Sequence, residues 1–144
     1  MASRSVDDLL PEVRDKVLAF VNGCAARGVT IMVYCTHRGP EEQALLYERG
    51  RTLPGPVVTK AKSWQSAHQY RRAADCVPMV LGKPLWKYEK NSPEWVIFGE
   101  EVEKAGLEWA GKWQRFREYV HVQDLSGKTI SQLFIAEVPT EATT

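Results

Sequence analysis

Four residues in two short segments could together hold a metal ion and move a proton. His68 and Asp75 lie seven positions apart in the segment SAHQYRRAAD. In a second segment, EYVH, Glu118 precedes His121 by three positions. A catalytic zinc ion typically takes three protein ligands and leaves a fourth position for water, whose proton a nearby unbound carboxylate can accept. The residue types match these roles, but spacing alone does not distinguish a metal site from ordinary histidines bonded to acids.

The spacing constrains the backbone that must position these side chains. Residues seven apart on a straight strand point to opposite faces, so a turn must separate His68 from Asp75 if both bind one ion. By the same parity, Glu118 and His121 would face oppositely on a regular strand. One of these two residues must therefore lie at the irregular start of the segment that begins at Tyr119.

The elements around the two segments follow from apolar periodicity and capping residues. Helices are expected from Ser5 as N-cap to Gly28, over 41–49, from Ser92 to Gly106, and near 129–134. Strands are expected over 29–36, 73–80, 107–113 and 119–123, with a hairpin turn at 81–83. Because helices and strands are segregated, the predicted fold class is α+β, in one small domain over residues 1–144 with a polar tail from about 137 to 144.

Composition and charge exclude several other classes. The net charge of +1 neither demands nor forbids a nucleic-acid partner. No Gly-rich phosphate loop follows a predicted strand, and we expect no nucleic-acid partner. The N-terminus has no apolar leader, and no stretch approaches the roughly 18 apolar residues of a membrane span. We therefore expect a protein made without export and not inserted in a membrane. The three cysteines form no CxxC pair and are expected to be buried free thiols.

The first segment resembles the SxHxxGxAxD signature of the zinc D-Ala-D-Ala peptidases and the L-alanyl-D-glutamate endopeptidases of phage endolysins. The second resembles the acid that precedes a histidine by three positions in the same family. The resemblance implies that His68, Asp75 and His121 bind Zn²⁺ and that Glu118 is the general base. It also implies a fold of the hedgehog/DD-peptidase type, with a central antiparallel sheet flanked by helices. Arg71 stands where the family usually has glycine, so a backbone that often needs glycine must here tolerate a large side chain.

Residues 35–52 resemble the stretch before the metal motif in the endolysin branch. This resemblance implies that Arg38 lies at the active site and stabilises the oxyanion of the tetrahedral intermediate, and it places Gln43 among the substrate-binding residues. Ser66, the first letter of the motif, is a candidate for a hydrogen bond within the site or else a simple loop hydroxyl. Among the tryptophans, Trp113 is expected to border the site.

The resemblance implies a zinc-dependent hydrolase of the peptidoglycan stem peptide that cuts the L-alanyl-D-glutamate bond. We expect a monomeric, phage-type endolysin, made in the host cytoplasm and acting on the cell wall after a holin-type partner has permeabilised the membrane. A D,D-carboxypeptidase or D-Ala-D-Ala dipeptidase would use the same chemistry on another bond. A noncatalytic zinc-containing binding module is the alternative from a different class, and the presence of Glu118 argues against it.

Overall fold

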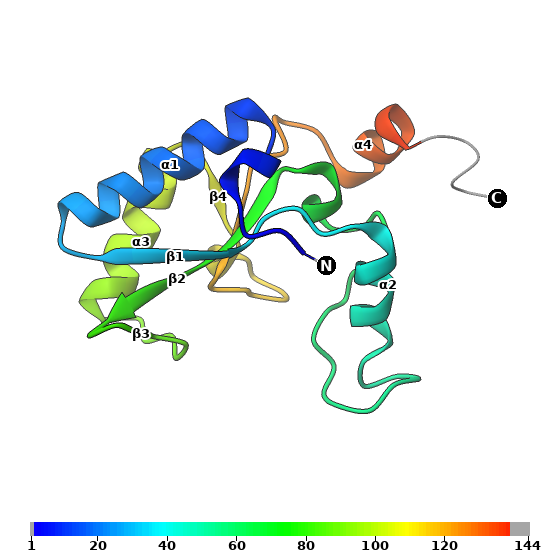
Figure 1. Cartoon of the computed structure of the whole chain (residues 1–144), viewed down its shortest axis with the longest axis horizontal. Coiled ribbons are helices and arrows are strands. Elements are labelled where there is room, and N and C mark those ends of the chain that lie inside the picture. Colours follow the sequence, from blue (N-terminus) through cyan, green and yellow to red (C-terminus); the bar gives the residue numbers. More distant parts are fainter. Residues whose placement is uncertain (1, 139–144) are drawn as a thin grey trace.

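The computed structural model, which describes residues 2–138, places an antiparallel sheet at the centre of the molecule (Figure 1). The strands are β1 (Thr30–Cys35), β2 (Ala73–Val80), β3 (Lys83–Pro84), β4 (Glu108–Trp109) and β5 (His121–Gln123). Their order is β1-β2-β5-β4, and β3 pairs with β2 as the expected hairpin. The predicted α+β class and the central antiparallel sheet are confirmed.

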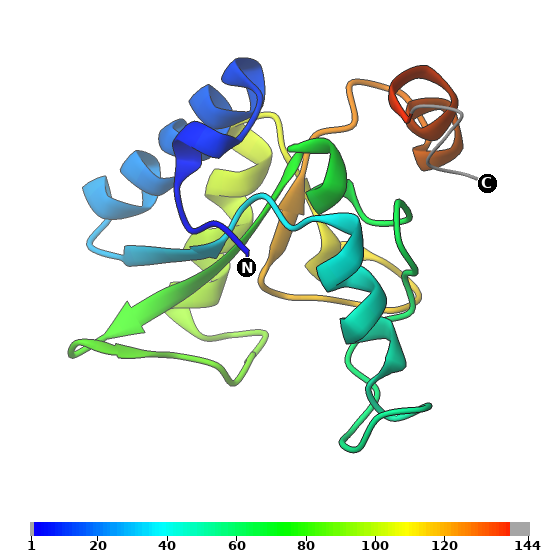
Figure 2. The same ribbon diagram turned by 45° about the vertical axis from the view of Figure 1, so that its right-hand side comes forward.

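Two helices cover one face of this sheet, and two others lie at the end of the molecule that is farthest from this pair (Figures 1 and 2). Helices α1 (Pro11–Ala26) and α3 (Pro93–Lys104) bury the apolar stripes that their periodicity predicted, and the rings of Phe20 and Phe98 meet edge to face at 4.9 Å. Helices α2 (Pro40–Glu48) and α4 (Ile130–Glu137) lie at the other end. No helix within residues 2–138 is long and apolar enough to cross a membrane.

The predicted start of the first helix is wrong, and so is the predicted length of the last. Ser5 caps a short 3-10 helix, Val6–Asp8, and α1 begins instead at Pro11, where a residue without an N–H group fits the first helical turn. Thr129 and Gln132 form a capping box that starts α4, which then continues three residues beyond the predicted end at Phe134. The rest of the expected polar tail, residues 139–144, lies outside the described residues.

Two predicted strands are also shorter than expected. After β4 the chain turns into a 3-10 helix, Ala110–Lys112, in which Gly111 packs so close to the indole of Trp109 that a Cβ atom would collide with it. The indole nitrogen of Trp109 donates to the backbone oxygen of Tyr119 at 2.8 Å, and β5 begins only at His121. This shortening leaves irregular backbone on the side of the sheet where the chemistry-bearing segments meet.

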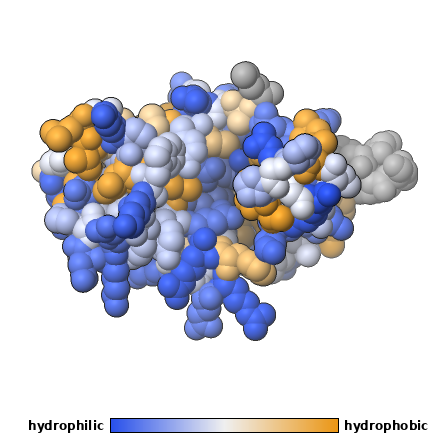
Figure 3. All heavy atoms as spheres, turned by 90° about the horizontal axis from the view of Figure 1, so that it is seen from below, coloured by the Kyte–Doolittle hydropathy of each residue, from blue (hydrophilic) through white to orange (hydrophobic). Residues whose placement is uncertain are grey.

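Seen from below, the surface is hollowed beside α2 and the loop that follows it (Figure 3). Hydrophilic side chains occupy much of this recess, whereas apolar side chains show on the parts to either side of it. The recess lies between α2 with its loop and the rest of the molecule.

Arg71 has a left-handed backbone conformation, with φ 60° and ψ 34°, as its correspondence to a family glycine suggested. Its Nη1 donates to the backbone oxygen of Asp8 at 2.9 Å. We expect Arg71→Ala to lower the free energy of unfolding by about 1 kcal/mol, because this hydrogen bond is lost and the backbone cost remains. Arg71→Gly should be close to neutral, since relief of the backbone offsets the lost bond. Urea unfolding of both variants tests this, and equal stabilities of the two would contradict it.

Candidate active site

A serine-capped turn positions His68. In the 3-10 turn Ala67–Tyr70, the hydroxyl of Ser66 accepts from the backbone nitrogen of His68 at 3.3 Å, and the side chain of Gln69 accepts from the backbone nitrogen of Ser66 at 3.1 Å. This reciprocal arrangement is a capping box. The observed bond makes the hydroxyl of Ser66 the N-cap of the turn that carries His68. The turn ends at Arg71 before β2 begins, so a turn separates His68 from Asp75, as the spacing predicted.

Strand β5 and the loop before it bring the second pair to the same place. Asp75 and His121 are direct partners in the antiparallel pairing of β2 with β5, which puts their side chains side by side. Glu118 lies before the strand in irregular backbone, as parity predicted. Its Oε2 is 3.7 Å from Nδ1 of His121.

Both histidines direct one ring nitrogen at the same carboxylate oxygen. Oδ1 of Asp75 lies 3.2 Å from Nε2 of His68 and 3.4 Å from Nδ1 of His121. The opposite nitrogens face acceptors: Nδ1 of His68 is 2.7 Å from the backbone oxygen of Thr36, and Nε2 of His121 is 2.7 Å from Oε1 of Gln123. A neutral imidazole has one N–H group, and in each ring this group donates to the acceptor named above. In the neutral form, the nitrogens that face Asp75 then carry lone pairs, and a proton or metal cation between them and the carboxylate would satisfy all three groups.

Charge interactions keep the carboxylate of this cluster ionised. Burial alone would raise the pKa of Asp75, but the imidazoles of His68 and His121 outweigh it and hold this pKa far below its usual value. Burial lowers the pKa of His121, but its bond to Asp75 and the charges of Asp75 and Glu118 raise this pKa above its usual value. The cluster thus stabilises positive charge, whether the charge is a proton or a metal ion.

The metal-free protein should lose stability as the pH rises through the folded-state pKa of His121. Because this pKa is raised above the unfolded value of about 6.5, the stabilisation is fully present below that pH and is lost above the folded value. Asp75 acts in the opposite sense, since its depressed pKa contributes stability above about pH 4 that is lost on acidification. Thermal unfolding of chelator-treated protein against pH measures the effect. A His121→Gln variant should flatten the alkaline side, and an unchanged profile in that variant would contradict the assignment.

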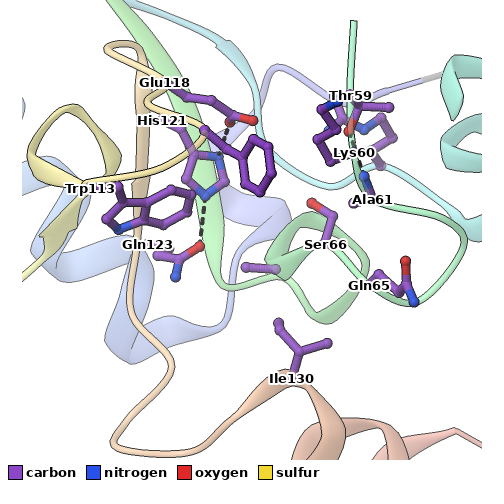
Figure 4. A pocket seen from close by; sticks show the side chains of 13 residues that line it. Thr59, Lys60, Ala61, Gln65, Ser66, Trp113, Glu118, His121, Gln123 and Ile130 are labelled. Atoms are coloured by element: carbon purple, nitrogen blue, oxygen red, sulfur yellow. Dashed lines mark hydrogen bonds and ion pairs between the residues drawn. The ribbon is translucent and has the colours of Figure 1, made fainter. Parts of the chain in front are cut away.

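The cluster opens into a pocket of about 290 Å³ (Figure 4). Glu118, His121 and Trp113 line one side of it, and residues 59–61 and Gln65 lie across from them. The ring centroids of Trp113 and His121 are 5.8 Å apart, so Trp113 lines the pocket beside this histidine. The pocket therefore combines an aromatic wall and an exposed carboxylate with His121, the member of the histidine–aspartate cluster that lines it.

Arg38 lines the pocket, but Gln43 does not. Nε of Arg38 donates to Oε1 of Gln43 at 2.9 Å, and Nη1 of Arg38 lies 4.0 Å from Oδ2 of Asp75. Gln43 is completely buried, and its amide also donates to the backbone oxygen of Ala61 at 2.8 Å. The side chain of Gln43 is therefore enclosed and orients Arg38, and its direct contact with substrate stays a prediction.

Cys35 is a site residue that the sequence analysis treated only as a buried thiol. Its Sγ lies 3.9 Å from Nδ1 of His68 and 3.7 Å from Nη1 of Arg38, and Cys35, His68 and Asp75 form a group that could hold a metal ion. Burial, together with the charge of Asp75, raises the pKa of Cys35 to about 11. Nδ1 of His68, the nitrogen nearest the thiol, is already hydrogen-bonded to the backbone oxygen of Thr36. These facts favour His121 over Cys35 as the third ligand.

The carboxylate of Glu108, on β4, holds two pocket side chains in place, a role that no sequence motif indicated. Oε1 of Glu108 accepts from the amide of Gln123 at 3.1 Å, and this amide presents its oxygen to His121. Oε2 of Glu108 accepts from the indole nitrogen of Trp113 at 2.7 Å. Glu108 thereby orients both the partner of His121 and the aromatic wall. Because the three segments meet only in the folded sheet, the linear sequence carried no signal for this arrangement.

A family model described as D-alanyl-D-alanine carboxypeptidase matches residues 59–124, which contain both the His68–Asp75 and the Glu118–His121 segments. Together with the fold and the cluster, this match defines the class of the protein as a peptidase of the M15 type. The side chains around Asp75 fit the metal dependence of that class.

The chain is also similar to a curated relative and to a solved structure. It is 32% identical over 122 residues to the peptidoglycan L-alanyl-D-glutamate endopeptidase CwlK of Bacillus subtilis (strain 168), which covers 81% of this chain and 73% of that protein. The chain therefore belongs to this peptidase family, as the two signatures indicated. The crystal structure of the Serratia marcescens L-Ala D-Glu endopeptidase ChiX matches with a TM-score of 0.57 at 19% identity, over 85% of this chain and 87% of that one. This likeness shows a shared fold.

Proposed function

We propose that this chain is a zinc-dependent endopeptidase that cleaves the L-alanyl-D-glutamate bond of peptidoglycan stem peptides. The observation that carries the proposal is the convergence of His68 and His121 on one oxygen of Asp75, beside Glu118 in an open pocket. Two imidazoles and a carboxylate are a ligand set that suits zinc with an open position. Similarity to CwlK over most of both chains supports the choice of bond.

In this proposal, His68, Asp75 and His121 hold the ion, which when bound supplies a Lewis acid and makes water more acidic. Glu118 is 47% exposed, so its carboxylate can reach a water molecule in the pocket. It accepts the proton of the attacking water and later donates it to the departing amine. Arg38, held in place by Gln43, stabilises the negative charge that develops on the carbonyl oxygen.

The proposed biological role is that of a phage-type endolysin. It is supported by the resemblance of residues 35–52 to the endolysin branch. The monomeric enzyme would accumulate in the host cytoplasm and reach the wall after a holin-type partner has opened the membrane. Expression in a bacterial host should then leave cells intact until the membrane is permeabilised, and lysis of cells with an intact membrane would contradict this role.

Mass spectrometry of purified peptidoglycan tests the reaction. After incubation with the zinc-loaded protein, we expect released peptides that begin with D-glutamate, and none in a chelator-treated control. The description of the matching family model favours one second candidate, a D,D-carboxypeptidase, which would release only terminal D-alanine. Peptides that begin with L-alanine would instead indicate an amidase. An unchanged polymer would favour a noncatalytic binding module.

A further inference from the structure

Lys60 places a positive charge on the pocket wall that lies across from His121 and Glu118 (Figure 4). Within residues 2–138 its ammonium group forms no ion pair, and its observed contact is with the ring of Phe116, 5.4 Å from the centroid. Arg38, the other Lys or Arg residue of the pocket lining, is already bonded to Gln43 and faces Asp75. Lys60 is therefore a second cation of this pocket, one that neither the proposed reaction nor an ion pair within residues 2–138 uses.

Phe116 keeps this lysine at the mouth of the pocket. Its backbone is left-handed, with φ 54°, and its side chain is 63% exposed, so neither backbone preference nor burial explains the ring position. The residue lies beside residues 57–60 along an adjoining cavity that Glu118 also lines. Left-handed backbone at a residue other than glycine is costly and clusters at functional sites, and the face of the ring attracts the cation.

We propose that Lys60, steadied by Phe116, binds the free α-carboxylate of D-glutamate on the leaving side of the scissile bond. This inference rests on the proposed function. In the stem peptide, D-glutamate continues through its γ-carboxyl group, so its α-carboxylate stays on the carbon that bears the scissile nitrogen. Three covalent bonds separate the carboxylate carbon from the reacting carbonyl carbon, a distance of about 4 Å at most. The anion must therefore lie in the same pocket as the reacting atoms.

A cation beside this group matters because Glu118, across the pocket from Lys60, is anionic. Glu118 lines both the pocket and the adjoining cavity, and a substrate carboxylate placed beside it would be repelled. The ammonium of Lys60 is a compact charge with three donors that can offset this repulsion. An amidated D-glutamate, D-isoglutamine, would gain nothing from Lys60. The enzyme should therefore prefer stem peptides whose α-carboxylate is free.

Another role for Lys60 would be to act on Glu118 itself. The observed ion pair of Glu118 is with His121 at 3.7 Å, and none with Lys60 is formed within residues 2–138. If Lys60 served mainly to adjust the basicity of Glu118, its removal would slow the reaction regardless of the substrate's own carboxylate. Comparing two substrates separates these roles.

The test uses two synthetic stem peptides that differ only in a free or an amidated D-glutamate α-carboxylate. We expect the wild-type protein to have a kcat/KM about 10-fold higher for the free acid. Lys60→Met should remove this preference by lowering kcat/KM for the acid, with a change below about 2-fold for the amide. Lys60→Arg should keep most of the preference for the free-acid peptide. Lys62→Met is the matched control, because Lys62 lies in the same loop with its Nζ 5.5 Å from the ring of Tyr47 and does not line the pocket.

Three outcomes would overturn the inference. An equal loss of kcat/KM on both peptides in Lys60→Met would mean that Lys60 adjusts the basicity of Glu118 instead of binding the substrate carboxylate. An unchanged preference in that variant would make Lys60 a solvated surface residue. If the wild-type protein cuts neither peptide between L-alanine and D-glutamate, the proposed function fails and this inference fails with it. Thermal unfolding of each variant identifies any loss that comes from misfolding.

Discussion

Glu118→Gln is expected to lower kcat on peptidoglycan by about 100- to 10,000-fold while metal binding is retained. The amide has nearly the same size as the carboxylate but cannot accept a proton from water. Glu118 lies beside the cluster, with its Oε2 3.7 Å from Nδ1 of His121, and its side chain is 47% exposed to the pocket solvent. Turnover of purified peptidoglycan and metal content of the same preparation are the two measurements.

Glu89→Gln is the matched control for this substitution, because Glu89 is an exposed glutamate whose ion pair with Lys87 lies outside the pocket. It should leave both quantities at the wild-type value. A Glu118→Gln protein that keeps its full rate would show that another group moves the proton. A variant that instead loses its metal would make Glu118 a ligand rather than a base.

Asp75→Asn should weaken zinc binding by at least about 100-fold and abolish activity at limiting metal. The substitution removes the negative charge on which both histidines converge, at 3.2 and 3.4 Å, while it preserves the shape of the side chain. Competition with a coloured chelator measures the affinity without any assay of turnover. Asp124→Asn serves as control, since Asp124 pairs with Lys16 at 2.6 Å and does not line the pocket.

The same affinity measurement distinguishes the two possible ligand sets. Cys35→Ser should leave zinc affinity within about 3-fold of wild type if His121 is the third ligand, whereas His121→Gln should lower it as strongly as Asp75→Asn. The reverse pattern would place the metal in the group formed by Cys35, His68 and Asp75. An unaltered affinity in Asp75→Asn would contradict both sets.

The sequence by itself determined which groups form the cluster and how the local backbone presents two of them. Ser66 and the residues after it encode a capped turn, and this turn depends only on neighbours within a few positions. The seven-residue separation of His68 from Asp75 demanded that turn, and the three-residue separation of Glu118 from His121 demanded irregular backbone. Local rules of this kind also predicted the buried apolar stripes of α1 and α3, because the helical spacing of apolar residues can be recognised within one continuous segment.

The tertiary structure alone decided which distant residues meet these groups. Asp75 faces His121 because β2 and β5 pair in one particular register, and the same sheet places Cys35 opposite Asp75. Gln43 proved to be a buried support for Arg38, and Glu108 a shared acceptor for Gln123 and Trp113. Strand register is set by the packing of the whole core, so contacts across the sheet are not encoded in either segment alone. The identities of the reacting groups are therefore local information, whereas their supports and the pocket around them depend on the complete fold.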